Sequence, residues 1–138
     1  MKLLRIGVVG YSGQNFDEDE ARVMLDKAFA KFDFEYDPES VEIVSGLTSL
    51  GIPKLAYELA THLGYLTRGV ACKLANNYEC FPCDIVEIIG DNWGDESEHF
   101  LATIDVLVRV GGGPQTMAET NIAKERGIAI MEFDLDPL

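Results

Sequence analysis

Residues 105–119 read Asp-Val-Leu-Val-Arg-Val-Gly-Gly-Gly-Pro-Gln-Thr-Met-Ala-Glu, and this stretch decides the fold. Its first part, Asp105–Val110, is an apolar run almost without alternation, which predicts a strand buried on both faces. Three glycines then lead directly into Pro114–Arg126, where the opening proline and the following Gly127 are typical of the two ends of a helix. A strand, a glycine loop and a helix in this order form the repeating unit of a parallel sheet.

The same unit recurs upstream of this stretch, and a last apolar run follows it. The further predicted strands are Leu3–Val9, Val41–Val44, Gly69–Cys72, Ile85–Ile89 and Ile128–Phe133. The further predicted helices run from Asp17 to Phe32, from Pro53 to Gly64 and from Asp95 to Ile104, and Leu74–Asp84 is expected to be an irregular loop. We therefore expect one α/β domain over residues 1–138, a Rossmann-like three-layer sandwich with a mainly parallel six-stranded sheet.

Glycine-bearing loops follow three of the predicted strands, at residues 10–14, 45–51 and 111–116. The carboxyl ends of parallel strands meet at one edge of a sheet, and N–H groups and hydroxyls in such loops suit a phosphate. The candidate binding residues are Gly10, Ser12, Gly13, Gly46, Thr48, Gly51, Gly112, Gly113 and Thr116. For any single loop, glycines that merely permit a tight turn are an equal alternative. Three such loops on one edge favour a binding site.

The charge of the chain limits its partners. With 24 acidic and 11 basic residues the formal net charge is −13, which argues against nucleic acid as a partner, because Lys and Arg supply most of that affinity. A small phosphorylated ligand stays compatible, since helix N-termini bind phosphate locally. No stretch approaches the roughly 20 apolar residues of a membrane span. The N-terminus lacks the features of a signal peptide, so we expect a cytoplasmic protein.

The segment from Gly111 to Glu119 resembles the P-G-G-x-G-T-x-x-E signature of the "Lonely Guy" (LOG) proteins, which belong to the DprA/SMF-like Rossmann superfamily and were formerly called possible lysine decarboxylases. The resemblance extends from about Leu3 to Met131. It implies that Gly112, Gly113 and Thr116 bind phosphate, and that Glu119 is the catalytic carboxylate in hydrolysis of the N-glycosidic bond of nucleoside 5′-monophosphates. It also implies a homo-oligomer, a dimer or tetramer, and we expect no metal and no further cofactor.

The chain departs from the LOG pattern at several positions. The family carries an Arg-Lys pair on the helix before the fifth strand, whereas Asp95–His99 here reads Asp-Glu-Ser-Glu-His, with Glu96 at the arginine position. Gly111 and Gln115 replace the proline and the last glycine of the signature. Loss of the arginine removes a phosphate clamp or a charge stabiliser, which favours binding without catalysis.

Two other features leave alternatives open. The pair Cys80 and Cys83, together with Cys72 and His99, could form a zinc site or a redox pair, but a single C-x-x-C favours structural thiols. Trp93 follows the fourth strand, where it could stack on a nucleobase or pack on a neighbouring subunit.

The sequence thus predicts a nucleotide-binding sensor or carrier with little catalysis. The alternatives are a phosphoribohydrolase that uses Glu119 and a structural subunit of an assembly.

Overall fold

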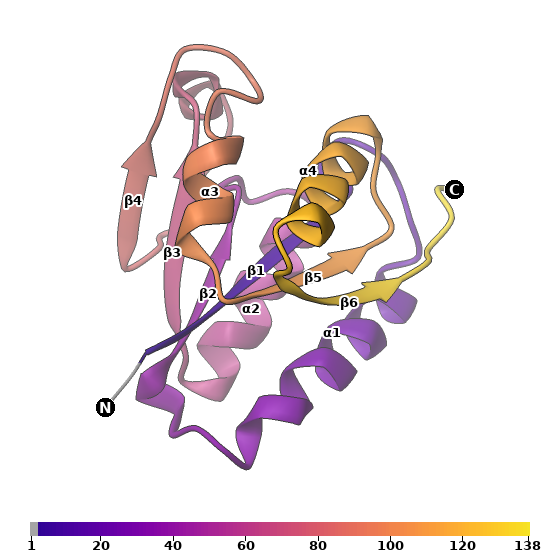
Figure 1. Ribbon diagram of the computed structural model, residues 1–138. Helices are drawn as coiled ribbons and strands as arrows, with labels where there is room; N and C mark the ends of the chain where they lie inside the picture. The colour runs from indigo at the N-terminus through magenta and orange to yellow at the C-terminus, as the bar shows by residue number, and fades with distance from the viewer. Residues whose placement is uncertain (1–2) are drawn as a thin grey trace.

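The computed structural model describes residues 3–138, which contain one sheet of six strands (Figure 1). The strands are β1 (Leu4–Gly10), β2 (Val41–Ser45), β3 (Leu66–Ala71), β4 (Ile85–Ile88), β5 (Val106–Val110) and β6 (Ala129–Phe133). Their order across the sheet is β4-β3-β2-β1-β5-β6, and each neighbouring pair is parallel. The predicted α/β fold is therefore confirmed.

Helices cover both faces of the sheet, which gives the three layers seen in Figure 1. The helices are α1 (Glu18–Asp33), α2 (Gly51–Leu63), α3 (Ser97–Thr103) and α4 (Pro114–Glu125). One apolar core joins α1 and α2 to the face that carries Ile6 and Val8, and a second core joins α3 and α4 to the face that carries Val9 and Leu107. Within residues 3–138, no helix has the length and apolar character needed to cross a membrane.

The strand order reverses at β1, which lies between β2 and β5. After β1 the chain builds β2, β3 and β4 toward one edge, and it then crosses back through α3 to place β5 on the other side of β1. In open α/β sheets, ligands bind outside the carboxyl ends of the strands at such a reversal. The three glycine-bearing loops follow β1, β2 and β5, so the topology brings them to this point.

Most element boundaries agree with the sequence-based expectation within one residue, and the starts of α2, α3 and β3 differ by two or three residues. Helix α2 begins at Gly51, so Pro53 occupies its third position rather than its first; this is tolerated because N–H groups of the first turn have no partner within the helix. Strand β3 begins at Leu66, three residues before the predicted Gly69. Thr67 and Arg68 hid its start, because polar residues in a central strand do not give an apolar run.

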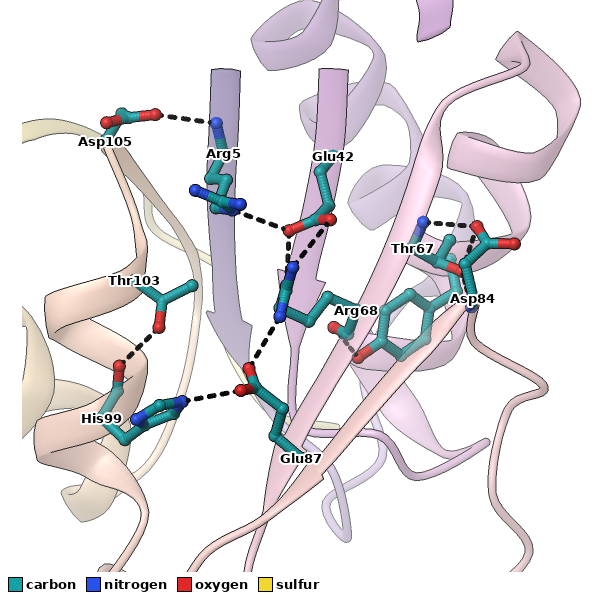
Figure 2. A network of polar contacts seen from close by, with 10 residues as sticks. Arg5, Glu42, Thr67, Arg68, Asp84, Glu87, His99, Thr103 and Asp105 are labelled. Carbon is teal, nitrogen blue, oxygen red and sulfur yellow. Dashed lines mark hydrogen bonds and ion pairs between the residues drawn. The ribbon is translucent and has the colours of Figure 1, made fainter. Parts of the chain in front are cut away.

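These polar residues belong to a network that crosses the sheet (Figure 2). The buried Glu42 on β2 accepts hydrogen bonds from Arg68 Nε at 2.6 Å and from Arg5 Nε at 3.0 Å, and Arg68 Nη1 donates to Glu87 Oε1 at 2.9 Å. Thr67 is held by the Asp84 carboxylate, which accepts its backbone N–H at 2.9 Å. A buried charge is tolerated when it is paired in this way.

Candidate functional site

A cavity of about 460 Å³ opens at the carboxyl ends of β1, β2 and β3. This volume lies in the range of small-molecule sites, roughly 300–1,000 Å³. Its lining brings together most of the predicted site residues: Gly10, Ser12, Gly13, Gly46, Thr48, Thr116 and Glu119. The other three, Gly51, Gly112 and Gly113, lie outside the lining.

The packing around Gly51 requires a glycine. Its φ is +56°, and a β-carbon there would lie 2.2 Å from the carbonyl oxygen of Tyr11. The next residue, Ile52, donates its N–H to that same oxygen at 2.8 Å. Glycine is therefore needed so that α2 can start directly against the loop that follows β1.

In the third glycine loop, packing also requires a glycine at position 112. Gly112 has a φ of +115°, and a β-carbon there would lie 2.3 Å from Thr116 Cγ2. Thr116 Oγ1 in turn donates to the carbonyl of Gly10 at 3.3 Å. A side chain at Gly112 would therefore strain the backbone and strike α4. By contrast, a β-carbon at Gly13 or Gly46 would meet no protein atom within 4 Å, and both residues line the cavity.

The second glycine loop holds an unusual backbone conformation. Leu47 has a φ of 74°, a region that residues with side chains rarely adopt. Its N–H donates to the hydroxyl of Tyr57 at 3.0 Å, and this fully buried hydroxyl donates to the carbonyl of Arg68 at 3.0 Å. Such outliers persist where the surroundings fix them, and they cluster at ligand sites.

Two carboxylates lie in the cavity wall. Glu96 is 6% exposed and Glu119 is 8% exposed. The Ser97 hydroxyl donates to Glu119 Oε2 at 2.7 Å, and the Gly94 N–H donates to Glu96 Oε1 at 2.8 Å. Burial raises the pKa of Glu119; the Ser97 hydrogen bond opposes that rise, and the nearby charge of Glu96 adds to it. Glu96, which the LOG resemblance places at the arginine position, therefore does face the candidate site.

None of the residues described as lining this cavity is a lysine or an arginine. The three arginines on the strands instead make ion pairs and hydrogen bonds within the protein. Arg5 and Arg68 pair with Glu42, while Arg109 Nε approaches Glu132 Oε1 at 2.9 Å and Arg109 Nη1 donates to the carbonyl of Gly111 at 2.9 Å. The side chains in the wall therefore supply negative charge.

Aromatic side chains line the same cavity. Trp93 lies in the loop after β4 and Tyr78 in the loop after β3, and their ring centroids are 6.0 Å apart at an interplanar angle of 56°. The position of Trp93 at the binding edge was predicted. Tyr78 was missed because it falls in the segment that we expected to be irregular.

In the described part of the chain, the cysteines and His99 are not brought into a group of three or more His, Cys, Asp or Glu side chains that could hold a metal ion. The three thiols are free, and burial raises the pKa of Cys83 to about 11, which disfavours its nucleophilic thiolate form. The segment that carries Cys80 instead supports the second glycine loop, since Phe81 N–H donates to the Leu47 carbonyl at 2.8 Å. His99 lies outside the lining, with Nε2 at 3.2 Å from Glu87 Oε2, an ion-pair distance rather than an aligned hydrogen bond.

Comparison with known proteins relates the fold to solved structures. No protein-family model and no curated protein sequence matches the chain. The molybdenum cofactor binding protein of the phototrophic bacterium Rippkaea orientalis has a TM-score of 0.79 at 20% identity, over 99% of this chain and 79% of that one. The molybdenum cofactor carrier protein of Chlamydomonas reinhardtii has a TM-score of 0.73 at 24% identity, over 95% and 76%. At these identities the likeness establishes the Rossmann-like fold, and the LOG resemblance stays a prediction.

Proposed function

We propose that this chain binds a phosphate-bearing small molecule, with a nucleotide as the expected class, and that it acts as a carrier or sensor with little catalysis. The observation that carries the proposal is the cavity at the strand-order reversal, into which all three glycine-bearing loops contribute residues. Gly13 and Gly46 leave open space where a phosphate could approach the backbone. The start of α4 adds free N–H groups and the positive end of a helix dipole.

The likeness to a molybdenum cofactor binding protein and to a carrier protein supports a carrier role. It also makes the molybdenum cofactor one of the ligands to be tested. In this proposal the phosphate lies among Gly10, Ser12, Gly13, Gly46, Thr48, Gly113 and Thr116, with Gly51 and Gly112 shaping the loops around it. We further propose that the protein is cytoplasmic and assembles as a dimer or tetramer, which light scattering after size exclusion would measure.

A thermal-shift and calorimetric screen tests the binding site. The ligands are AMP, GMP, CMP, ribose 5-phosphate and the molybdenum cofactor, and binding should raise Tm by linkage. Gly46→Val should abolish the shift while leaving the ligand-free Tm within about 2 °C, because its β-carbon enters open space. Ala118→Val, on the exposed part of α4 outside the lining, is the size-matched control. Absence of any shift at millimolar ligand would refute the proposal and favour a structural subunit.

A phosphoribohydrolase that uses Glu119 is the second candidate. A buried carboxyl with a raised pKa that faces a cavity is typical of a general acid or base. The lining residues, however, provide no cation to stabilise the charge that develops in the transition state, and such a loss costs about 10²–10³ in rate. Release of free base from the monophosphates, followed by chromatography, separates the candidates. Brisk turnover that disappears in Glu119→Gln would establish the enzyme.

A further inference from the structure

We propose that Trp93 and Tyr78 form a subsite for a planar ring, so that the ligand of the cavity joins a flat heterocycle to its phosphate. This inference rests on the proposed function and specifies the class of molecule that the site takes. Trp93 is 47% exposed and Tyr78 is 51% exposed, although both line the cavity. Large aromatic faces left open to solvent in a concave wall are typical of a site that a ring covers.

The local structure fixes the loops that carry the two rings. The Asp95 carboxylate accepts the N–H groups of Asp91 and Asn92, both at 3.0 Å, which closes the loop around Trp93. Tyr78 follows a 3₁₀ turn, and its N–H donates to the Ala75 carbonyl at 3.1 Å. Because these hydrogen bonds fix the backbone of both loops before a ligand binds, less conformational entropy is lost on binding.

The ring subsite lies beside the second glycine loop, because the Ser49 N–H donates to the Glu79 carbonyl at 2.8 Å. It lies further from the loop that follows β1, since Tyr78 and Trp93 follow β3 and β4 on the far side of β2. With strands about 4.8 Å apart, the carboxyl ends of β1 and β3 lie about 10 Å from each other. A ligand that spans them needs a linker, such as a sugar, between its phosphate and its ring. Since the pair lies in the wall of a cavity, a flat surface of a second copy would fit it poorly.

Trp93 is the single tryptophan of the chain, so its fluorescence reports directly on the subsite. We would titrate the protein with GMP and AMP, which have both parts, with ribose 5-phosphate, which lacks the ring, and with guanosine, which lacks the phosphate. The nucleotides should quench Trp93, and ribose 5-phosphate should bind by calorimetry without quenching it. Trp93→Ala should weaken nucleotide binding about 5- to 150-fold, the range that base–aromatic stacking corresponds to. It should leave ribose 5-phosphate binding unchanged.

Controls separate stacking from general damage. Trp93→Phe should retain most of the affinity, Tyr78→Ala should lose part of it, and Phe34→Ala, at a fully exposed aromatic outside the lining, should have no effect. If nucleotides and ribose 5-phosphate bind equally and Trp93→Ala changes neither, the ring subsite is refuted while the phosphate site stands. If guanosine quenches Trp93 and phosphate adds nothing, the phosphate site fails and the ring subsite stands. A change of oligomer mass in Trp93→Ala with unchanged affinity would assign the pair to subunit packing and overturn the inference.

Discussion

Removing the hydroxyl of Tyr57 should destabilise the protein and loosen the second glycine loop. This buried hydroxyl is bonded to the backbone N–H of Leu47 and to the backbone carbonyl of Arg68, both at 3.0 Å. Tyr57→Phe leaves the Leu47 N–H without its partner, whereas the Arg68 carbonyl lies in β3, which pairs with β2 and β4. One unpaired buried group costs about 1–3 kcal/mol, so the free energy of unfolding should fall by about that amount. For a domain of this size that corresponds to a fall in Tm of about 3–12 °C.

Scanning calorimetry of the ligand-free protein measures this change. The substitution keeps the ring of Tyr57 stacked on Phe81, at a centroid distance of 5.0 Å, so it isolates the hydroxyl. Tyr36→Phe is the matched control, because the Tyr36 hydroxyl makes no hydrogen bond within residues 3–138. Ligand affinity should fall together with Tm, since Leu47 is no longer held at its positive φ. If Tyr57→Phe melted within 2 °C of the parent protein, the hydroxyl would not be what fixes this loop.

Three further outcomes follow from the site. Gly10→Ala should cost about 1–3 kcal/mol, because its β-carbon would lie 2.3 Å from the carbonyl oxygen of Val110, whereas Gly13→Ala should be neutral in the same denaturant titration. Burial raises the pKa of Glu119, so the folded protein holds that proton more tightly, and the associated stability is lost as pH rises through the raised pKa. The Tm of Glu119→Gln, relative to that of the parent protein, should therefore rise as the pH increases above about 4.5, and a Tm difference that is the same at all pH values would contradict this. Because burial raises the pKa of Cys83 to about 11, thiol reagents at pH 8 should modify Cys83 far more slowly in the folded protein than in the unfolded chain.

The fold could be predicted from sequence wherever one local pattern decided an element. The apolar run from Asp105 to Val110 predicts a buried strand, and the glycines after it predict a loop before a helix. The structure has both. The start of β3 could not be predicted in this way. Thr67 and Arg68 are acceptable in β3 because they have partners on β2, on β4 and in the loop before β4, and such pairing is not local in sequence.

The candidate site was predicted in its position more fully than in its detail. Counting back along the LOG pattern put Glu96 at the arginine position, and Glu96 does line the cavity. The sequence shows where a glycine is present. It does not show which neighbouring atoms leave no room for a side chain at that position. Gly51 and Gly112 were assigned to the ligand, yet the β-carbons they lack would strike Tyr11 and Thr116. Tyr78 carries no periodic signal, so only the fold could bring it beside Trp93.

The charge of the cavity leads to a last prediction, on ionic strength. A site that holds phosphate with lysine or arginine weakens as salt rises, because salt screens the attraction. Here the lining offers backbone N–H groups together with the carboxylates of Glu96 and Glu119, in a chain of net charge −13. Salt would mainly screen repulsion between the ligand and these acids, so affinity for a nucleoside monophosphate should stay level or tighten between 50 and 300 mM salt, a range over which the Debye length falls from about 14 to 6 Å. Calorimetry with sodium acetate and sodium chloride in parallel excludes competition by one anion, and Glu96→Gln should both tighten binding and flatten its dependence on salt. A steep loss of affinity with salt in the parent protein would mean that a cation outside this lining reaches the phosphate.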